Sequence, residues 1–234
     1  MALASLTPAL PPPVQAVLDR VLAGPPAPVV FDADGTLWRG DVGEDLLRYL
    51  GVEGVVARPG VYAEYERLHD REPAAAYAFA VEVMAGLELR RLEPLCADFF
   101  ARRYAGRVYP WVRPLLALLA ERGFPAWICS ASPRWIVEAA ADHLRIPRPR
   151  VIAVDAELDG DVLSARVLRP VVCGPGKVTW LQRREVRPVV AFGNGELDLD
   201  MLAYAEHAVV VAPPDATPWL AREAASRGWP VLRT

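Results

Sequence analysis

The sequence predicts an α/β fold, in which a parallel sheet carries helices on both faces and an all-helical segment is inserted near its start. Two observations predict the sheet. After residue 110, short apolar runs alternate with segments of helical spacing, and several of these runs end in polar residues. A third observation predicts the insertion, because residues 41–109 show helical patterns only. We therefore expect an N-terminal arm and helix (1–24), a core (25–40 and 110–234) and a helical cap domain (41–109).

The composition is that of a globular protein with a sizeable core. The chain has 234 residues, of which 53% are hydrophobic and 24% charged, so global disorder is not expected. The net charge of −3 offers no basic surface for nucleic acid. No apolar run approaches the ~20 residues that a membrane span needs, and residues 1–24 lack the pattern of a secretory signal. Three widely spaced cysteines favour reduced thiols and a cytoplasmic location (Cys96, Cys129 and Cys173).

The first elements are an arm, a helix and a buried strand. Residues 1–13 are rich in proline and indicate an irregular arm. Val14–Ala23 has helical spacing. Val29–Phe31 is a short apolar run that ends at Asp32-Ala33-Asp34-Gly35, which predicts a buried parallel strand followed by a turn.

Four helices are expected in the cap. Prolines fall where three of them could begin, at Pro59, Pro73 and Pro94. The expected helices are Glu44–Leu50, Val61–Asp70, Pro73–Leu87 and Leu92–Tyr104.

Strands and helices alternate through the rest of the chain. The Asp159-Gly160 pair inside Glu157–Leu168 predicts a hairpin turn. The expected strands are Pro125–Cys129, Val151–Val154, Val189–Phe192, Ala208–Ala212 and Val231-Leu232. The expected helices are Trp111–Arg122, Arg134–Leu144, Gly176–Glu185, Asp198–Ala205 and Pro218–Arg227.

Two residues stand out by their rarity. Of the 26 basic residues, Lys177 is the one lysine and the rest are arginine, and Asn194 is the one asparagine. A lysine that survives such a bias suggests a site where a compact ammonium is needed and a planar guanidinium does not fit.

Polar residues follow four of the expected strands. Asp32 and Asp34 follow the first, and two residues apart in an extended segment they point the same way. Carboxyl ends of parallel strands meet at one edge of a sheet, so these groups can converge. Acids, an amide, a hydroxyl and an ammonium together suit a divalent cation plus a phosphate. The other members of the set are Ser130, Ser132, Lys177, Asn194 and Asp198.

These four groups, in this order, resemble the motifs of the haloacid dehalogenase superfamily. The motifs are Asp-Ala-Asp-Gly-Thr from Asp32, Ser130, Lys177 at a helix start, and Gly-Asn-Gly-Glu-Leu-Asp from Gly193. The helical cap and the hairpin resemble the phosphoserine phosphatase-like branch. The resemblance implies a Rossmann-like core and, because Asp34 stands two residues after Asp32, a phosphatase.

The resemblance also implies roles for the catalytic residues. Asp32 is expected to attack phosphorus and form an aspartyl-phosphate. Asp34 is expected to protonate the leaving alkoxide and then deprotonate the attacking water. Ser130 would hold the phosphoryl group, and Lys177 would pair with that group and with Asp32. Thr36 would steady the nucleophile loop at the rim of the substrate site.

Magnesium is the cofactor that the resemblance implies. Its expected ligands are Asp32, the backbone carbonyl of Asp34, Asn194 and Asp198, with Asp198 either supporting the metal or orienting Lys177. Asn194 departs from the family, which usually has a metal-binding aspartate at that position. A neutral amide is a weaker ligand for a hard cation but still offers an oxygen.

The substrate is expected to be a small phosphorylated metabolite, with specificity set by the cap and the loop after Trp38. Asp41 stands near the acid with which phosphoserine phosphatases bind the substrate's amino group, and Glu44 is the other candidate. Ser132 is either a further substrate contact or the cap of the next helix. Trp38 and the cap tyrosines could hold a cationic head group, although packing inside the cap is the simpler interpretation. The three histidines show no ligand spacing and are expected to be structural or on the surface (His69, His143 and His207).

Two other functions fit the same residues, namely a phosphotransferase or mutase and a non-catalytic phosphate-binding protein. The enzyme is expected to be a monomer or a homodimer.

Overall fold

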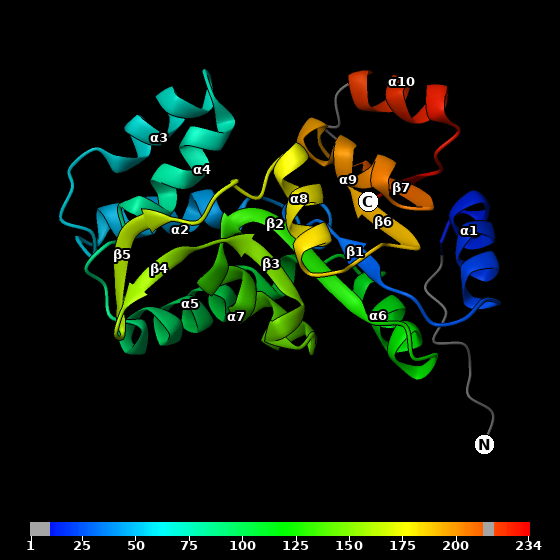
Figure 1. The fold of residues 1–234 in the computed structure, drawn as a ribbon, viewed down its shortest axis with the longest axis horizontal. Helices are drawn as coiled ribbons and strands as arrows, with labels where there is room; N and C mark the ends of the chain where they lie inside the picture. Colours follow the sequence, from blue (N-terminus) through cyan, green and yellow to red (C-terminus); the bar gives the residue numbers. More distant parts are fainter. Residues whose placement is uncertain (1–9, 213–217) are drawn as a thin grey trace.

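The computed structural model describes residues 10–212 and 218–234 and contains a six-stranded parallel sheet (Figure 1). The strand order is β3-β2-β1-β6-β7-β8, so the chain starts in the middle, builds one half of the sheet and then returns to build the other. Ligands in such sheets bind where the order reverses, at the carboxyl end of β1. The strands are β1 (Val29–Phe31), β2 (Ala126–Pro133), β3 (Val151–Val154), β6 (Val190–Gly193), β7 (His207–Ala212) and β8 (Val231–Arg233).

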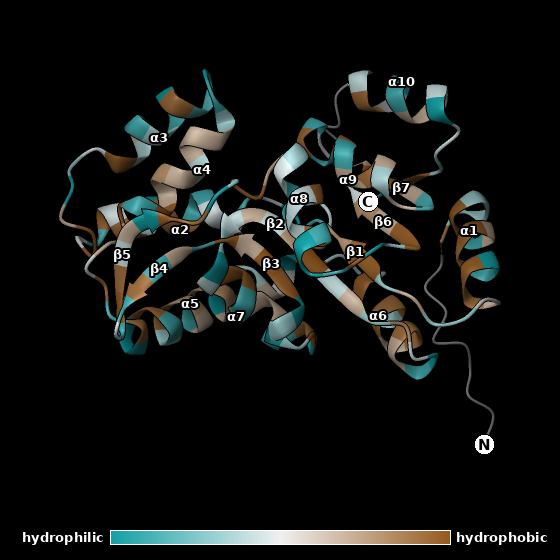
Figure 2. Ribbon diagram, in the orientation of Figure 1, coloured by the Kyte–Doolittle hydropathy of each residue, from teal (hydrophilic) through white to brown (hydrophobic). Residues whose placement is uncertain are grey.

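Helices cover both faces of this sheet. The helices α6 and α7 lie on one side, and α8 and α9 lie on the other (Figure 1), as right-handed crossovers in opposite directions require. The strands between them are apolar and buried, and Figure 2 shows the hydrophobic colour concentrated on β1, β6 and β7. The helices of this part are α1 (Pro12–Leu22), α6 (Val112–Glu121), α7 (Arg134–Leu144), α8 (Pro175–Arg183), α9 (Leu199–Tyr204) and α10 (Pro218–Arg227). The predicted α/β fold with a parallel, helix-covered sheet is confirmed.

Residues 41–109 form a helical block beside the carboxyl ends of the strands (Figure 1). As expected, the elements here are helical: α2 (Val42–Val52), α3 (Val61–His69), α4 (Pro73–Glu82), α5 (Leu89–Arg103) and a short 3₁₀ turn. α5 packs against α7 of the sheet layer, while α3 and α4 pack on each other.

A hairpin connects the sheet region with this block. It is formed by β4 (Ala156–Asp159) and β5 (Val162–Val167), as the Asp159-Gly160 turn predicted. Leu163 exchanges backbone hydrogen bonds with the segment after α4: its N–H donates to Leu87 O at 2.9 Å, and its carbonyl accepts from Gly86 N at 2.8 Å.

Several boundaries differ from the sequence prediction. α4 ends at Glu82 and not at Leu87, because the following residues turn to bond with the hairpin. α5 begins at Leu89, so Pro94 lies inside this helix and not at its start. β2 continues to Pro133, with a register shift after Cys129. Of the predicted N-terminal arm, residues 1–9 lie outside the described residues.

Two further expectations concern the solvent and redox environment. The three cysteines are free and buried, as expected for small apolar residues. In the part of the chain that the structure describes, no helix has the length and apolarity to cross a bilayer.

Candidate active site

Asp32 lies at the carboxyl end of β1 and is held by Lys177. The Asp32 N–H donates to Phe192 O at 2.8 Å, which extends the pairing of β1 with β6 by one residue. Lys177 Nζ donates to Asp32 Oδ1 at 2.7 Å and to Asp198 Oδ1 at 2.6 Å. The lysine is only 1% exposed. The sole lysine of the chain therefore bridges two carboxylates inside the protein, and it does so by presenting a compact ammonium.

The start of α8 places Lys177 in this position. Gly176 packs directly on the preceding loop, and a Cβ there would lie 1.9 Å from Val171 O. Only glycine allows this approach, which brings the first turn of α8 close enough for the lysine to reach Asp32.

Asp198 organises the loop after β6. Its Oδ2 accepts hydrogen bonds from Asn194 N at 2.9 Å and from Gly195 N at 3.0 Å, while Oδ1 is bound to Lys177. Both carboxylate oxygens are thus engaged with protein donors. Of the two roles that the resemblance offered for Asp198, this geometry favours orienting Lys177 over direct metal ligation.

Three oxygens converge between β1 and the loop after β6, and their spacing suits Mg²⁺. The side-chain oxygen of Asn194, Oδ1, lies 2.9 Å from Asp34 O and 3.1 Å from Asp32 Oδ2; rotation of the amide by 180° would put its nitrogen in this position. Neighbouring oxygens of an octahedral Mg²⁺ site, with bonds of 2.0–2.1 Å, lie about 2.9 Å apart. With its oxygen in that position, Asn194 completes a cradle for the cation; with its nitrogen there, it donates to the same two oxygens. The residues present therefore fit Mg²⁺.

This donor set is unusual in its chemistry. In the described residues, no three His, Cys, Asp or Glu side chains gather as a metal-binding group. The set instead consists of one carboxylate, one amide and one main-chain carbonyl. Thr36, which is fully buried, donates from Oγ1 to Asn194 Oδ1 at 3.1 Å. Thr36 thus steadies this loop from within and does not face the substrate.

The buried charges do not balance within the protein. Burial, and then the charge of Asp198, raises the pKa of Asp32 to about 7, although Lys177 opposes this rise. Burial alone would lower the pKa of Lys177, but Asp198 and Asp32 together hold it well above its usual value. The ammonium group of Lys177 is thus paired with two carboxylates, those of Asp32 and Asp198, and a divalent cation would supply the missing positive charge.

Asp34 lies beside Asp32, and its carboxylate is surrounded by donors. Its Oδ1 accepts from Trp38 Nε1 at 2.7 Å and from Val42 N at 2.6 Å, and its Oδ2 accepts from Ser132 Oγ at 2.7 Å. Burial raises the pKa of Asp34 and outweighs these hydrogen bonds, which lower it. Because Trp38 is fully buried, the idea that it holds a cationic head group is wrong.

The two serines of β2 take different places. Ser132 was the candidate cap of the next helix, but the residue before α7 is Pro133, without a side-chain cap, and Ser132 turns to Asp34 instead. Ser130 is buried, and its Oγ accepts from Ser132 N at 3.1 Å. Ala131 and Ser132 line a pocket over the site, and Ser130 is not among the residues that line it.

A pocket of about 240 Å³ opens above these groups, between the sheet and the helical block. Asp41 reaches its wall from the N-cap of α2, where it accepts from Glu44 N at 2.8 Å. Burial, and then the charges of Asp34 and Glu44, raises the pKa of Asp41 well above its usual value. The lining residues are Asp32, Asp34, Asp41, His69, Tyr77, Ala131, Ser132, Lys177, Asn194, Gly195, Glu196, Leu197 and Asp198.

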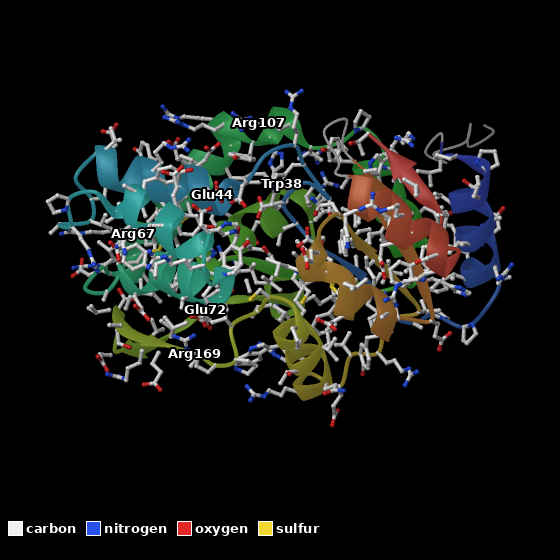
Figure 3. All side chains as sticks on the ribbon, turned by 90° about the horizontal axis from the view of Figure 1, so that it is seen from above. Trp38, Glu44, Arg67, Glu72, Arg107 and Arg169 are labelled. Carbon is white, nitrogen blue, oxygen red and sulfur yellow. The ribbon has the colours of Figure 1, made fainter. Side chains whose placement is uncertain are left out.

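The structure does not bring Glu44 to this pocket. Its carboxylate accepts from Tyr65 at 3.3 Å and from Tyr62 at 3.5 Å, inside the helical block. Figure 3 shows Glu44 on the helices of the block, with Trp38 closer to the sheet.

The pocket also contains His69, for which no site role was expected, and Tyr77, one of the cap tyrosines considered for a cationic head group. His69 and Tyr77 lie on its wall, with His69 Nε2 and the Tyr77 hydroxyl 3.3 Å apart. His69 thus lies on the pocket wall and packs against Tyr77, and its structural role stays a prediction. Nothing in the local sequence could have placed it here, because its position depends on how α3 and α4 pack over the sheet.

Comparisons with known proteins find a curated relative of this chain. The chain is 28% identical over 154 residues to the phosphoserine phosphatase SerB2 of Mycobacterium tuberculosis, and the match covers 66% of this chain but 35% of that protein. The chain thus spans about a third of this relative's length.

Solved structures share the fold at low sequence identity. A Bordetella pertussis Tohama I protein of unknown function superimposes with a TM-score of 0.74, 17% identity, and coverage of 89% of this chain and 98% of that one. A phospho-aspartyl intermediate analogue of phosphoserine phosphatase gives a TM-score of 0.58, with 17% identity and coverage of 86% and 91%.

A family model, that of the haloacid dehalogenase-like hydrolases, matches residues 29–203. The match begins at β1 and runs through α9, so it includes Asp32, Lys177 and Asp198. It confirms the resemblance drawn from the four motifs. Because this match covers most of the chain, the protein belongs to the haloacid dehalogenase-like hydrolase family.

Proposed function

We propose that this protein is a Mg²⁺-dependent phosphatase that hydrolyses a small phosphomonoester through an aspartyl-phosphate on Asp32. The observation that carries the proposal is the meeting of Asp32, Asp34, Lys177 and Asn194 at one pocket. Membership in a hydrolase family and the similarity to a phosphoserine phosphatase support the reaction class.

The first half of the reaction uses the two aspartates in different ways. With Asp32 Oδ2 facing Asn194 in the cation cradle, the other oxygen, Oδ1, which Lys177 holds, attacks phosphorus. As the new Oδ1–P bond forms, the bond from phosphorus to the substrate oxygen breaks, and the departing alkoxide takes a proton from Asp34. Burial favours this proton on Asp34 because it raises the pKa of the carboxyl group.

The second half returns the enzyme to its starting state. Asp34 removes a proton from a water molecule, whose oxygen attacks the same phosphorus and releases Asp32 and inorganic phosphate. Lys177 neutralises part of the negative charge on the transferring group. Mg²⁺, held by Asp32, the carbonyl of Asp34 and Asn194, would supply the remaining positive charge.

The pocket supports a substrate whose leaving group carries an amino or quaternary ammonium group. The wall of the pocket contains Asp41 and the ring of Tyr77, both suited to a cation. Lys177 is already paired with two carboxylates, and the described residues that line the pocket include no arginine to receive a carboxylate of the leaving group. This favours a phosphocholine-like or phosphoethanolamine-like ester over phosphoserine itself.

A binding protein without turnover is the second candidate, and Asn194 is the observation that favours it. In the orientation where its amide nitrogen donates to Asp32 Oδ2 and Asp34 O, Asn194 satisfies these oxygens without any cation.

The test is phosphate release by the full chain with Mg²⁺, measured on para-nitrophenyl phosphate and a panel of small phosphomonoesters. Asp32→Asn should abolish release, chelation should stop it, and the matched change Asp19→Asn on the exposed face of α1 should leave it intact. Added alcohols or sugars that divert phosphate into new esters would indicate a phosphotransferase. Full activity of Asp32→Asn would overturn the proposal, and Mg²⁺-dependent binding of phosphate analogues without turnover would favour the binding protein.

A further inference from the structure

Three donors from separate parts of the chain hold the carboxylate of Asp34. The indole of Trp38 follows in the same loop, the Val42 N–H belongs to the first turn of α2, and the Ser132 hydroxyl comes from the end of β2. The two N–H···O distances, 2.7 and 2.6 Å, are short, and the O–H···O distance of 2.7 Å is usual for a hydroxyl that donates to a carboxylate. The carboxylate therefore has a fixed orientation and not merely a fixed location.

The Trp38 contact is more than a consequence of packing. Trp111 and Trp135 are also buried, yet their indole nitrogens have no hydrogen-bond partner in the described structure. Trp38, which is 0% exposed, directs its N–H at Asp34. Because Trp38 has no surface in the pocket, any effect it has on the reaction must pass through another residue.

The Ser132 contact depends on a close approach of α2. A Cβ on Gly43 would lie 2.4 Å from Ser132 Oγ, so a side chain at this position would displace the hydroxyl. The first turn of α2 therefore packs against Ser132 while Val42 N donates to Asp34. The two contacts form together, which joins the start of the helical block to the Asp34 carboxylate.

We infer that Trp38 and Ser132 are positioning residues that orient the carboxyl group of Asp34 toward the leaving oxygen of the substrate. The inference rests on the proposed function, in which Asp34 gives its proton to the alkoxide. Proton transfer requires a narrow geometry, and a carboxyl group free to rotate loses it. Ser132 on this view acts on Asp34 and does not bind the substrate.

The leaving group distinguishes this role from a structural one. An alkoxide needs a proton as its bond to phosphorus breaks, whereas para-nitrophenolate leaves without one. Loss of orientation at Asp34 should therefore slow the formation of the aspartyl-phosphate, which kcat/KM reports, much more for alkyl phosphomonoesters than for para-nitrophenyl phosphate. The later attack of water, in which Asp34 acts as a base, is common to both esters and does not enter kcat/KM. A general loss of stability or of active protein lowers both rates by the same factor.

The experiment compares kcat and KM of the full chain on para-nitrophenyl phosphate and on the alkyl ester that the wild type hydrolyses best. Trp38→Phe and Ser132→Ala should each lower kcat/KM on the alkyl ester about tenfold or more, with less than about threefold change in kcat/KM on the aryl ester. The matched controls are Trp135→Phe, which removes an unpartnered indole N–H, and Ser164→Ala, which removes another buried hydroxyl. Both controls should leave the ratio of the two rates unchanged.

A double variant makes the test independent of folding losses in Trp38→Phe. In an Asp34→Asn background, Ser132→Ala should cause no further loss on the alkyl ester, because its effect passes through Asp34. If kcat/KM falls equally for both esters in Ser132→Ala, or if its loss persists in the Asp34→Asn background, the inference is overturned while the phosphatase proposal stands. If the wild type releases phosphate from neither ester, the proposed function fails, and the inference fails with it.

Discussion

Replacing Lys177 with methionine tests the charge balance of the site directly. The methionine keeps much of the side-chain volume but leaves Asp32 and Asp198 buried without their shared ammonium, which lies 2.7 and 2.6 Å from them. Removing one partner of a buried ion pair costs about 3–5 kcal/mol. For a chain of this size, that corresponds to a fall in melting temperature of roughly 6–20 °C.

The assay is thermal and urea unfolding of the metal-free protein, in chelator, at pH 8 and at pH 5.5. The loss should be larger at pH 8. Burial already raises the pKa of Asp32 to about 7 against the opposing charge of Lys177, so without Lys177 this carboxyl group takes up a proton at pH 5.5 and the repulsion falls. Mg²⁺ should restore part of the stability, because it supplies positive charge to the same carboxylates.

Arg166→Met is the matched control. Arg166 also pairs with two carboxylates, Glu157 at 2.5 Å and Asp159 at 2.9 Å, but the three side chains are more than half exposed. Solvent screens such pairs, so this variant should unfold close to the wild type at both pH values. If Lys177→Met lost no more stability than Arg166→Met, the idea that one buried ammonium balances the site would be refuted.

Three further predictions follow from positions in and near the pocket. Gly176→Ala should lower stability by about 1–3 kcal/mol in urea unfolding, whereas Gly106→Ala, where a Cβ meets nothing within 4 Å, should not show this loss. Asp41→Asn should raise KM for cationic esters about tenfold but leave KM for para-nitrophenyl phosphate unchanged. Glu44→Gln should raise KM for cationic esters less, because Glu44 lies outside the pocket. Equal effects of the two changes would contradict the placement of Asp41. Asn194→Asp should lower the Mg²⁺ concentration for half-maximal activity about tenfold, since a carboxylate is a better ligand for a hard cation than an amide. An unchanged Mg²⁺ titration would exclude residue 194 from the metal site.

The sequence predicted the sheet and the convergence of the main site residues because both depend on local patterns. Apolar runs mark buried strands, and polar residues at their carboxyl ends must meet at one edge. The rarity of lysine and asparagine pointed to Lys177 and Asn194 without any motif, and the structure places both beside Asp32.

The remaining features depend on contacts between distant segments. The partners of Asp34 include Ser132, 98 residues away, and neither residue's neighbours in the sequence indicate this bond. His69 reaches the pocket only through the packing of α3 and α4 over the sheet. The early end of α4 likewise follows from its hydrogen bonds to the hairpin. Tertiary contacts outweigh local preference at each of these places.

The hairpin β4–β5 limits how the pocket can admit a substrate. The helical block is joined to the sheet by its two chain connections, near residues 40 and 110, and again by the hydrogen bonds of Leu163 to Gly86 and Leu87. Because the helical block is held at these three places, it cannot rotate away from the sheet as one rigid body without breaking one of these connections. Movement is therefore expected in α3 and α4, because the end of α3 and the start of α4 form none of these three connections. Exchange of substrate and product should therefore proceed by a local shift of these two helices, at a rate set by their packing and not by a hinge.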